Sequence, residues 1–327
     1  MHMADALLSP AVGLTMGGLS AAAIAISAAK IKKDELSEKK IPVMGVAGAM
    51  VFAGQMINFT IPATGSSGHI GGGILLAGLL GGTPAFLSMA AVLIIQCLFF
   101  ADGGLLALGC NIFNLGVIPC LLIYSLLFKP LLSRGVGYKR LSAASVVSVV
   151  IGLELGAFCV VLQTLMSGIT ALPFGVFAAL MLPIHLLIGL VEGVVTAAVL
   201  CFVYKTRPEL IDAYGSAERL SGVSTKKVVV TFAVLTVAIG GGLSLFASGN
   251  PDGLEWAIEK ITDTLSGVEA VLPTAFLPDY GFASDPENAA GTSVSGLVGA
   301  AVTFALAAGA GLLISKVKRH RKARTNV

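Results

Sequence analysis

The placement of basic residues constrains this chain more than any other feature of its 327-residue sequence. Of the 21 lysines and arginines, all but Lys260 fall in four short clusters, at 30–40, 129–140, 205–227 and 316–324. Long apolar stretches separate the clusters. Only 12% of the residues are charged, whereas charged residues make up about a quarter of a soluble domain. The sequence therefore predicts an all-α polytopic membrane protein, because apolar runs of about 20 residues cross a bilayer as helices.

Basic clusters in short loops mark the cytoplasmic side of a membrane, so an even number of spans separates two such clusters. Between the first two clusters, four spans fit the length better than two, although the run at 69–82 is short and glycine-rich. A broken or re-entrant helix of that kind is tolerated where protein surrounds it. This reasoning predicts nine spans, with the N-terminus extracytoplasmic and the C-terminus cytoplasmic. The spans are expected at 9–29, 41–58, 69–82, 84–101, 103–128, 142–168, 173–204, 228–247 and 293–315.

A charged segment divides the predicted spans into seven and two. Residues 1–204 form the predicted seven-helix unit, 205–227 a cytoplasmic linker, and 228–327 a two-helix unit with an extracytoplasmic loop at 248–292. We interpret the acidic residues of that loop as a solvated surface in preference to a metal-collecting segment. They are Asp252, Glu255, Glu259, Asp263, Glu269, Asp279, Asp285 and Glu287. The basic clusters belong to the cytoplasmic face of the membrane, so no nucleic-acid partner is expected.

The N-terminus is itself a candidate chelator. The α-amine of Met1, the amide nitrogen of residue 2 and the imidazole of His2 can close adjacent five- and six-membered rings around one ion. Three coplanar nitrogens, one of them an ionised amide, suit Ni(II) or Cu(II) in square-planar geometry. Binding releases protons, so the affinity is expected to rise with pH.

His69 is the candidate for a fourth nitrogen. It lies in a polar, glycine-rich stretch at 58–73, which the predicted topology puts on the same side of the membrane as the N-terminus. Its glycines permit close approach of the backbone. The alternative is a flexible external loop in which the hydrogen bonds of His69 are satisfied and it binds no metal. Side chains that could orient the ligands are Asn58, Ser66, Ser67, Asp5, Asp102 and Asn111.

Three further ionisable groups, His185, Glu154 and Glu192, fall at membrane depth, where such groups are costly unless paired and are often functional. His185 suits either a hydrogen-bonded packing role or a ligand role. The two glutamates suit a proton relay or a contact for partner helices. The sequence holds no nucleotide-binding loop of the Walker type and no nucleophile–base pair. We therefore expect a protein that is not an enzyme and has no ATPase of its own.

Five short motifs resemble a known transport family. Met1-His2-Met3-Ala4-Asp5, Gly65-Ser66-Ser67-Gly68-His69 and Phe100-Ala101-Asp102-Gly103-Gly104 followed by Asn111 resemble the metal-binding component of energy-coupling-factor nickel/cobalt transporters. Pro251-Asp252-Gly253-Leu254-Glu255 and Leu277-Pro278-Asp279-Tyr280-Gly281 resemble the small two-helix accessory component of the same systems. Nearly the whole chain is thus similar to a natural fusion of the two components. Residue 3 is methionine where many relatives carry isoleucine.

The resemblance implies that Met1, His2 and His69 hold the ion, in a seven-helix unit whose N-terminus tucks into the membrane body. It also implies a transmembrane coupling component, a pair of cytosolic ATPases, no cofactor beyond the transported ion, and a place in the lipid of a bacterial cytoplasmic membrane. ATP-driven reorientation of the binding unit would move the ion inward.

Nickel ranks before cobalt as the expected ion, since a planar site of four nitrogens suits Ni(II). One alternative is Co(II) uptake for cobalamin synthesis by the same mechanism. Others are a proton-coupled secondary metal transporter that uses Glu154, Glu192 and His185, and a vitamin-binding protein on the same scaffold.

Overall fold

The structure is a computed structural model that describes residues 1–31, 40–211, 225–263, 275–286 and 288–325. Its helices confirm the all-α polytopic fold class expected from the sequence. The helices up to the predicted linker are α1 (Pro10–Lys30), α2 (Lys40–Gln55), α3 (Gly73–Leu80), α4 (Gly82–Phe100), α5 (Leu108–Ile112), its π-helical continuation η3 (Phe113–Phe128), α6 (Lys129–Leu132), α7 (Tyr138–Ser167) and α8 (Phe174–Thr206). The later helices are α9 (Thr225–Gly241), α10 (Gly253–Thr262) and α11 (Ala289–Thr325). Single 3-10 turns occur at η1 (Asp5–Leu7), η4 (Pro208–Leu210), η7 (Leu243–Phe246) and η8 (Pro278–Tyr280).

The local sequence explains where several helices begin and end. α1 has Pro10 in its first turn, and the hydroxyl of the preceding Ser9 accepts a hydrogen bond from the Val12 amide. α7 ends at Ser167, and the capping residue Gly168 takes a left-handed conformation with φ of +63° that suits glycine. α8 begins directly after Pro173, whose backbone is extended.

The predicted spans can be compared directly with the helices. Each of the nine coincides at least in part with a helix. Within the described ranges, six helices are long and apolar enough to cross a membrane. The second, third and eighth predicted spans coincide with shorter helices, because α2 has 16 residues, α3 only 8 and α9 17. Every residue of α3 is buried, as expected of a short helix at membrane depth that protein surrounds.

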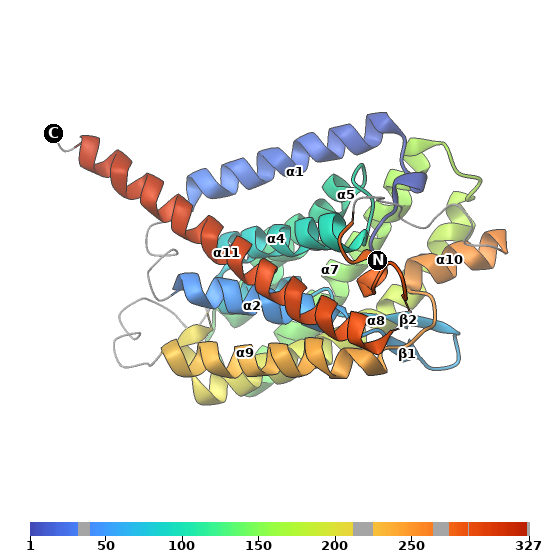
Figure 1. The fold of residues 1–327 in the computed structure, drawn as a ribbon. Helices are drawn as coiled ribbons and strands as arrows, with labels where there is room; N and C mark the ends of the chain where they lie inside the picture. Colours follow the sequence, from blue (N-terminus) through green and yellow to red (C-terminus); the bar gives the residue numbers. More distant parts are fainter. Residues whose placement is uncertain (32–39, 212–224, 264–274, 287, 326–327) are drawn as a thin grey trace.

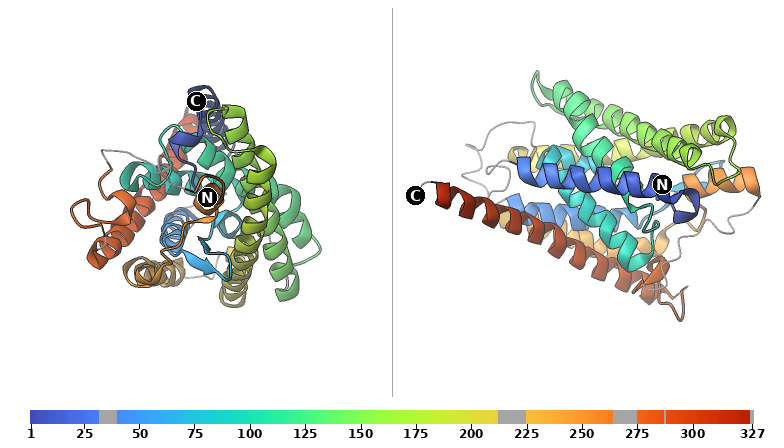
Figure 2. Two further views of the ribbon diagram at one scale, coloured as in Figure 1. Left: turned by 90° about the vertical axis from the view of Figure 1, so that its right-hand side faces the viewer. Right: turned by 90° about the horizontal axis from the view of Figure 1, so that it is seen from above.

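The long helices lie side by side, and the two chain termini lie at opposite ends of the bundle (Figure 1). α10 and the strands β1 (Phe59–Ile61) and β2 (Ser66–Gly68) lie at the end that holds the N-terminus. Viewed from that end, the N-terminus lies among the helices (Figure 2). The first residues of the chain therefore enter the body of the protein.

Two elements at this end were not expected from the apolar runs. β1 and β2 form a short antiparallel hairpin with Thr60 opposite Ser67, and its turn contains Gly65 with φ of +76°. α10 lies inside the segment 248–292, which we predicted to be a loop. Asp252 and Glu255 form a capping box at its start. α10 is short and half polar, so a search for long apolar runs does not detect it.

α11 packs against both α2 and α9 through small residues. A Cβ added to Gly45 of α2 would lie 2.8 Å from the ring of Phe304, and one added to Gly299 of α11 would collide with the ring of Phe52. Small residues of this kind let membrane helices approach closely. The packing brings the segment between α9 and α11 to the N-terminal end of the bundle.

Several predictions lie outside the described residues. These include most of the linker at 205–227, part of the basic cluster at 30–40, and two acidic residues of the external loop, Glu269 and Glu287.

Candidate metal centre

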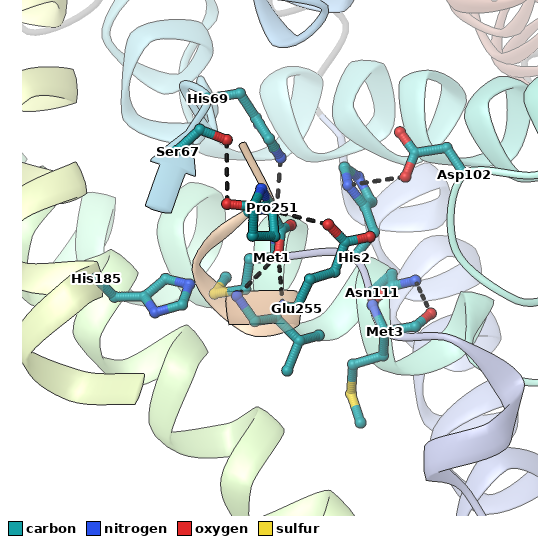
Figure 3. Close-up of polar contacts among 12 residues, drawn as sticks. Met1, His2, Met3, Ser67, His69, Asp102, Asn111, His185, Pro251 and Glu255 are labelled. Atoms are coloured by element: carbon teal, nitrogen blue, oxygen red, sulfur yellow. Dashed lines mark hydrogen bonds and ion pairs between the residues drawn. The ribbon is translucent and has the colours of Figure 1, made fainter. Parts of the chain in front are cut away.

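The α-amine of Met1 lies inside the protein, where it meets the histidine expected from the sequence. The Met1 side chain is only 4% exposed. Its amine nitrogen lies 3.5 Å from Nε2 of His69 and donates a hydrogen bond of 2.6 Å to Oδ2 of Asp252 (Figure 3). The structure thus brings Met1 and His69 together, although 67 residues separate them in the sequence.

Main-chain hydrogen bonds hold the N-terminal segment in this position. The amide of Met3 donates to Oδ1 of Asn111, and the Met3 carbonyl accepts bonds from Asn111 Nδ2 and from the amide of Gly104. Asp5 accepts a bond of 2.9 Å from the amide of Ala107. A Cβ at Gly104 would collide with Asp5, so the second glycine of Ala-Asp-Gly-Gly is needed here. Asp5 and Asn111 therefore position the segment that carries the proposed ligands.

His2 lies against His69, with ring centroids 5.3 Å apart and an angle of 17° between the ring planes. Burial lowers the pKa of His2, although the nearby carboxylate of Asp102 opposes that shift. Burial therefore favours the neutral form of the ring, which lies in close contact with Asp102. That contact joins His2 Nδ1 to Asp102 Oδ1 at 3.2 Å.

The orientation of the His2 ring matters for chelation. Nδ1 is the nitrogen that closes a six-membered ring with the amide nitrogen of the same residue, and in the structure it faces Asp102 (Figure 3). The imidazole must turn about its side-chain bonds to ligate an ion bound by the Met1 amine. Tyr280 donates a hydrogen bond of 2.5 Å to the other oxygen of Asp102. Asp102 therefore links His2 to the second motif of the two-helix unit.

The tautomer of His69 is set by its own loop. Nδ1 lies 3.0 Å from the carbonyl of Ile70, which can only accept a hydrogen bond, so the proton is on Nδ1 and Nε2 carries the lone pair. Burial, together with the ammonium of Met1, lowers the pKa of His69 to about 3. The Nε2 that faces the Met1 amine is thus available as a metal ligand.

Glu192 fixes the glycines that follow His69. Its carboxylate accepts hydrogen bonds of 2.8 Å from the amides of Gly71 and Gly72. The carbonyl of Gly71 in turn accepts a bond from Gln55. Glu192 is therefore paired with backbone donors, and α8 determines the course of the chain after His69.

The Pro-Asp-Gly-Leu-Glu motif pairs with the strand that precedes His69. The amide of Ser67 donates to the carbonyl of Pro251 at 2.8 Å, and its hydroxyl donates to the carbonyl of Asn250 at 2.7 Å. Ser67 and Asp252 also form a parallel bridge. These bonds bring Asp252 to the Met1 amine.

The two oxygens of Asp252 have separate partners. Oδ1 accepts bonds from the amides of Leu254 and Glu255 at the start of α10, and Oδ2 accepts from Met1. Burial would raise the pKa of Asp252, but the charge and hydrogen bond of the Met1 ammonium outweigh that effect and lower it. One side chain thus caps a helix and contacts the proposed chelate.

The other expected positioning residues lie in two places. Ser67 joins the loop of His69 to the motif at Asp252, and the Ser66 hydroxyl donates to the carbonyl of Ser67. Asn58 instead accepts a hydrogen bond from Ser248 through its carbonyl, and its Oδ1 has no partner among the described residues. Asn58 is thus tied to the accessory segment.

Sequence reasoning did not place Asp252 or Tyr280 at the N-terminus. The sequence signal was present, because both belong to motifs of the accessory unit, but no local pattern shows which partner each motif meets. Likewise, Glu192 was recognised as costly without a partner, and only the fold shows the two glycine amides that it binds.

The arrangement offers nitrogen ligands with acidic neighbours. The Met1 amine, the amide of residue 2, and the rings of His2 and His69 meet in one buried place (Figure 3). The residues around them are mainly small or apolar, and two carboxylates, from Asp102 and Asp252, adjoin them. Such a site suits a divalent ion of the later first-row transition metals.

The chain is similar to known metal transport proteins. Residues 2–210 match the family model for the cobalt uptake substrate-specific transmembrane region, CbiM, and residues 226–316 match the PDGLE domain. The "Putative fused nickel transport protein NikMN" of Archaeoglobus fulgidus is 32% identical over 312 residues, which covers 94% of this chain and 96% of that protein. The "Fused nickel transport protein NikMN" of Rhodobacter capsulatus is 26% identical over 304 residues, a match that covers 86% of this chain and 84% of that protein.

A solved structure is also similar. The crystal structure of a truncated transition metal transporter superposes with a TM-score of 0.56 at 29% sequence identity. The match covers 63% of this chain and 99% of the other.

Proposed function

Because this chain belongs to the CbiM family of cobalt uptake substrate-specific transmembrane proteins and carries a PDGLE domain, we propose that it is the metal-binding component of an ATP-driven nickel importer. In this proposal the end of the bundle that holds the N-terminus faces outward, and Ni(II) is captured there. A separate transmembrane coupling component and a pair of cytosolic ATPases drive the transport step in this proposal. Its own role is to select and hold the ion.

One observation carries the proposal: the buried Met1 amine lies 3.5 Å from a lone-pair nitrogen of His69. A charged amine buried inside a membrane protein is costly unless it is paired. Here the carboxylate of Asp252 and the imidazole of His69 lie next to the amine. The amide of residue 2 lies next to the amine, and the ring of His2 is stacked on His69. We propose that these four nitrogens form the plane that holds Ni(II).

Cobalt is the second candidate, and the name of the matched family favours it. A planar set of amine, ionised amide and two imidazoles favours Ni(II), because Ni(II) accepts square-planar nitrogen coordination. Competition between the two ions for the purified full chain, read by elemental analysis, distinguishes them. Nickel should displace cobalt at equal concentration.

The decisive experiment changes only the N-terminus. Adding two residues before Met1 converts its amine into an amide, and the buried Met1 side chain leaves no room for the added residues. We expect calorimetry to show one bound Ni(II) for the natural chain and no tight binding for the extended chain. The same two residues added after Val327 serve as the control and should leave binding unchanged.

Retained tight binding in the N-terminally extended chain would refute the chelate. A separate measurement tests the energy source: Ni(II) uptake into vesicles should need the coupling component and the ATPases. Uptake driven by a pH gradient in vesicles that contain this chain alone would favour the proton-coupled alternative, with Glu154, Glu192 and His185 as its path.

A further inference from the structure

His185 presents an unpaired ring nitrogen inside the protein. It lies on α8 and is 1% exposed. Its Nδ1 lies 2.7 Å from the carbonyl of Met181, which can only accept a hydrogen bond, so the proton is on Nδ1. Nε2 therefore carries a lone pair, and it has no hydrogen-bond partner among the described residues. Buried polar atoms are nearly always paired, so an exception at membrane depth calls for an explanation.

The unpaired nitrogen belongs to a residue that lines a cavity beside the proposed metal site. Met1, His69, Asp252 and His185 all line this cavity. Figure 3 shows the ring of His185 directed toward the Met1 side of the site. Gly253 lies at the same place, and a Cβ there would lie 3.0 Å from Cε1 of His185. An imidazole in the ligand-ready tautomer thus borders the space next to the chelate without taking part in it.

Along α8, His185 lies about one turn before Ile188, which a Cβ at Gly68 beside His69 would contact. It is 11 residues beyond Phe174, where α8 begins, which corresponds to roughly 16 Å along the helix axis. Glu192 follows seven residues later on the same face of the helix.

A second cavity extends toward Glu192. Glu192 and Asn114 line it, and it shares Gly71, Leu115 and Leu153 with the cavity at His185. Two small cavities therefore share a wall beside the proposed metal site. His185 borders the first of them.

We propose that His185 is a transit ligand, which accepts the metal ion through Nε2 when the ion leaves the site at Met1, His2 and His69. This inference rests on the proposed function. In the exchange, a bond forms between the ion and Nε2 of His185 while the bond to Nε2 of His69 breaks. One neutral imidazole replaces another, so no electron or proton is transferred in that step.

The alternative is a packing role, and it fits the contacts less well. A histidine with only a packing role either hydrogen-bonds through both ring nitrogens or can be exchanged for an apolar residue without loss of stability. Glu192, on the same face of α8, shows the paired pattern, because both of its oxygens bind loop amides. His185 keeps one nitrogen unpaired beside the proposed ligands.

The test separates resident binding from transport. Purified full-length His185→Ala should still bind one Ni(II), whereas cells that produce it with the coupling component and ATPases should take up Ni(II) about tenfold more slowly than wild type. Ile184→Ala is the matched control, because it removes a buried side chain from the same helix without removing a ligand. Ile184→Ala should retain both binding and uptake.

A spectroscopic variant reports the contact itself. In Ni(II)-loaded His185→Cys, the softer thiolate should draw the ion, and a thiolate-to-nickel absorption band absent from the wild type should appear. The five native cysteines are present in both proteins, so the wild type provides the baseline.

Three results would overturn the proposal: wild-type uptake by His185→Ala, loss of stoichiometric binding in that variant, or no new band in His185→Cys. Failure of the proposed function has a different signature. In that case the wild type itself binds no Ni(II), or His69→Ala binds it as well as the wild type does.

Discussion

Carboxylates contact two of the nitrogens that we propose as ligands. The Met1 amine bonds to Asp252, and His2 Nδ1 faces Asp102. Asp252 comes from the accessory unit, and Tyr280 of the same unit bonds to Asp102. The accessory unit therefore contacts Met1 directly through Asp252, and it reaches His2 indirectly through Tyr280 and Asp102.

A substitution at Asp252 separates its two contacts. Asp252→Asn keeps a good helix cap, since asparagine caps as well as aspartate, but it removes the negative charge from the Met1 ammonium. Losing a hydrogen bond between charged groups costs about 1.5–3 kcal/mol. We expect a lower melting temperature for the chelator-treated variant in a thermal-shift assay. Glu255→Gln, which alters only the capping box, should melt close to wild type, and equal losses in the two variants would contradict the role of the amine.

The burial of His69 predicts an effect of pH on stability. Its pKa falls from 6.5 to about 3 on folding, so between these values the unfolded chain binds a proton that the folded chain does not. Stability therefore falls as the pH drops from 6.5 toward 3, and it rises with pH in that range. Burial lowers the pKa of His2 as well, so His2 adds to the same slope.

Melting temperatures of chelator-treated protein at pH 7 and pH 4.5 measure this effect. The difference should be smaller in His69→Gln, whose side chain does not titrate. An equally large difference in His69→Gln would show that the pH effect arises elsewhere.

At the scale of elements, contacts from several parts of the chain hold the segment from β1 to the start of α3. The hairpin places Ser67 against Pro251, and Glu192 of α8 and Gln55 of α2 hold Gly71. Each support comes from a different helix or loop. His69 is therefore positioned by tertiary contacts, because its own segment is too short and glycine-rich to be rigid alone.

Removing Glu192 tests this arrangement. Glu192→Ala leaves two buried amides without an acceptor, and each such group costs about 1–3 kcal/mol. We expect a lower melting temperature and weaker Ni(II) binding by calorimetry, since Gly71 lies two residues from His69. Glu154→Ala is the control: it removes a carboxylate from the neighbouring α7, and its effect on Ni(II) binding should be small. Unchanged binding in Glu192→Ala would mean that the loop holds its shape without α8.

At the scale of the whole molecule, close helix packing joins the PDGLE domain at 226–316 to the CbiM region at 2–210. α11 contacts α2 at Gly299 and Phe52, and it crosses α9 at Gly296 and Gly240. There is no strong hydrophobic drive between helices in lipid, so shape complementarity at small residues carries the association. This packing is what brings Asp252 to the N-terminus.

A large side chain at the crossing should separate the units. Gly299→Leu places four carbons where even a Cβ collides with Phe52. When residues 1–210 and 211–327 are produced as two chains, we expect the natural pair to co-purify and the Gly299→Leu pair to do so much less. Gly309→Leu on the same helix, where a Cβ would meet nothing within 4 Å, is the control. Equal recovery of both pairs would contradict the packing.

The sequence by itself determined the membrane class, the long apolar helices and the candidate ligands. Apolar runs and basic clusters act through local solvation, so they identify spans without knowledge of neighbours. Met1 and His2 are adjacent in the chain, and their chelating geometry follows from bond connectivity alone. The short α3 (Gly73–Leu80) was recognisable as an unusual helix from the short, glycine-rich run at 69–82.

Only the tertiary structure decided what surrounds those ligands. Met1 meets His69, and Asp252 binds the Met1 amine, although these residues are far apart in the sequence. The unpaired nitrogen of His185 belongs to a residue that lines the same cavity. A motif specifies its own backbone through caps and glycines, but its partner depends on how helices pack. Small residues on α2, α9 and α11 determine that packing, and no local pattern shows which small residues face each other.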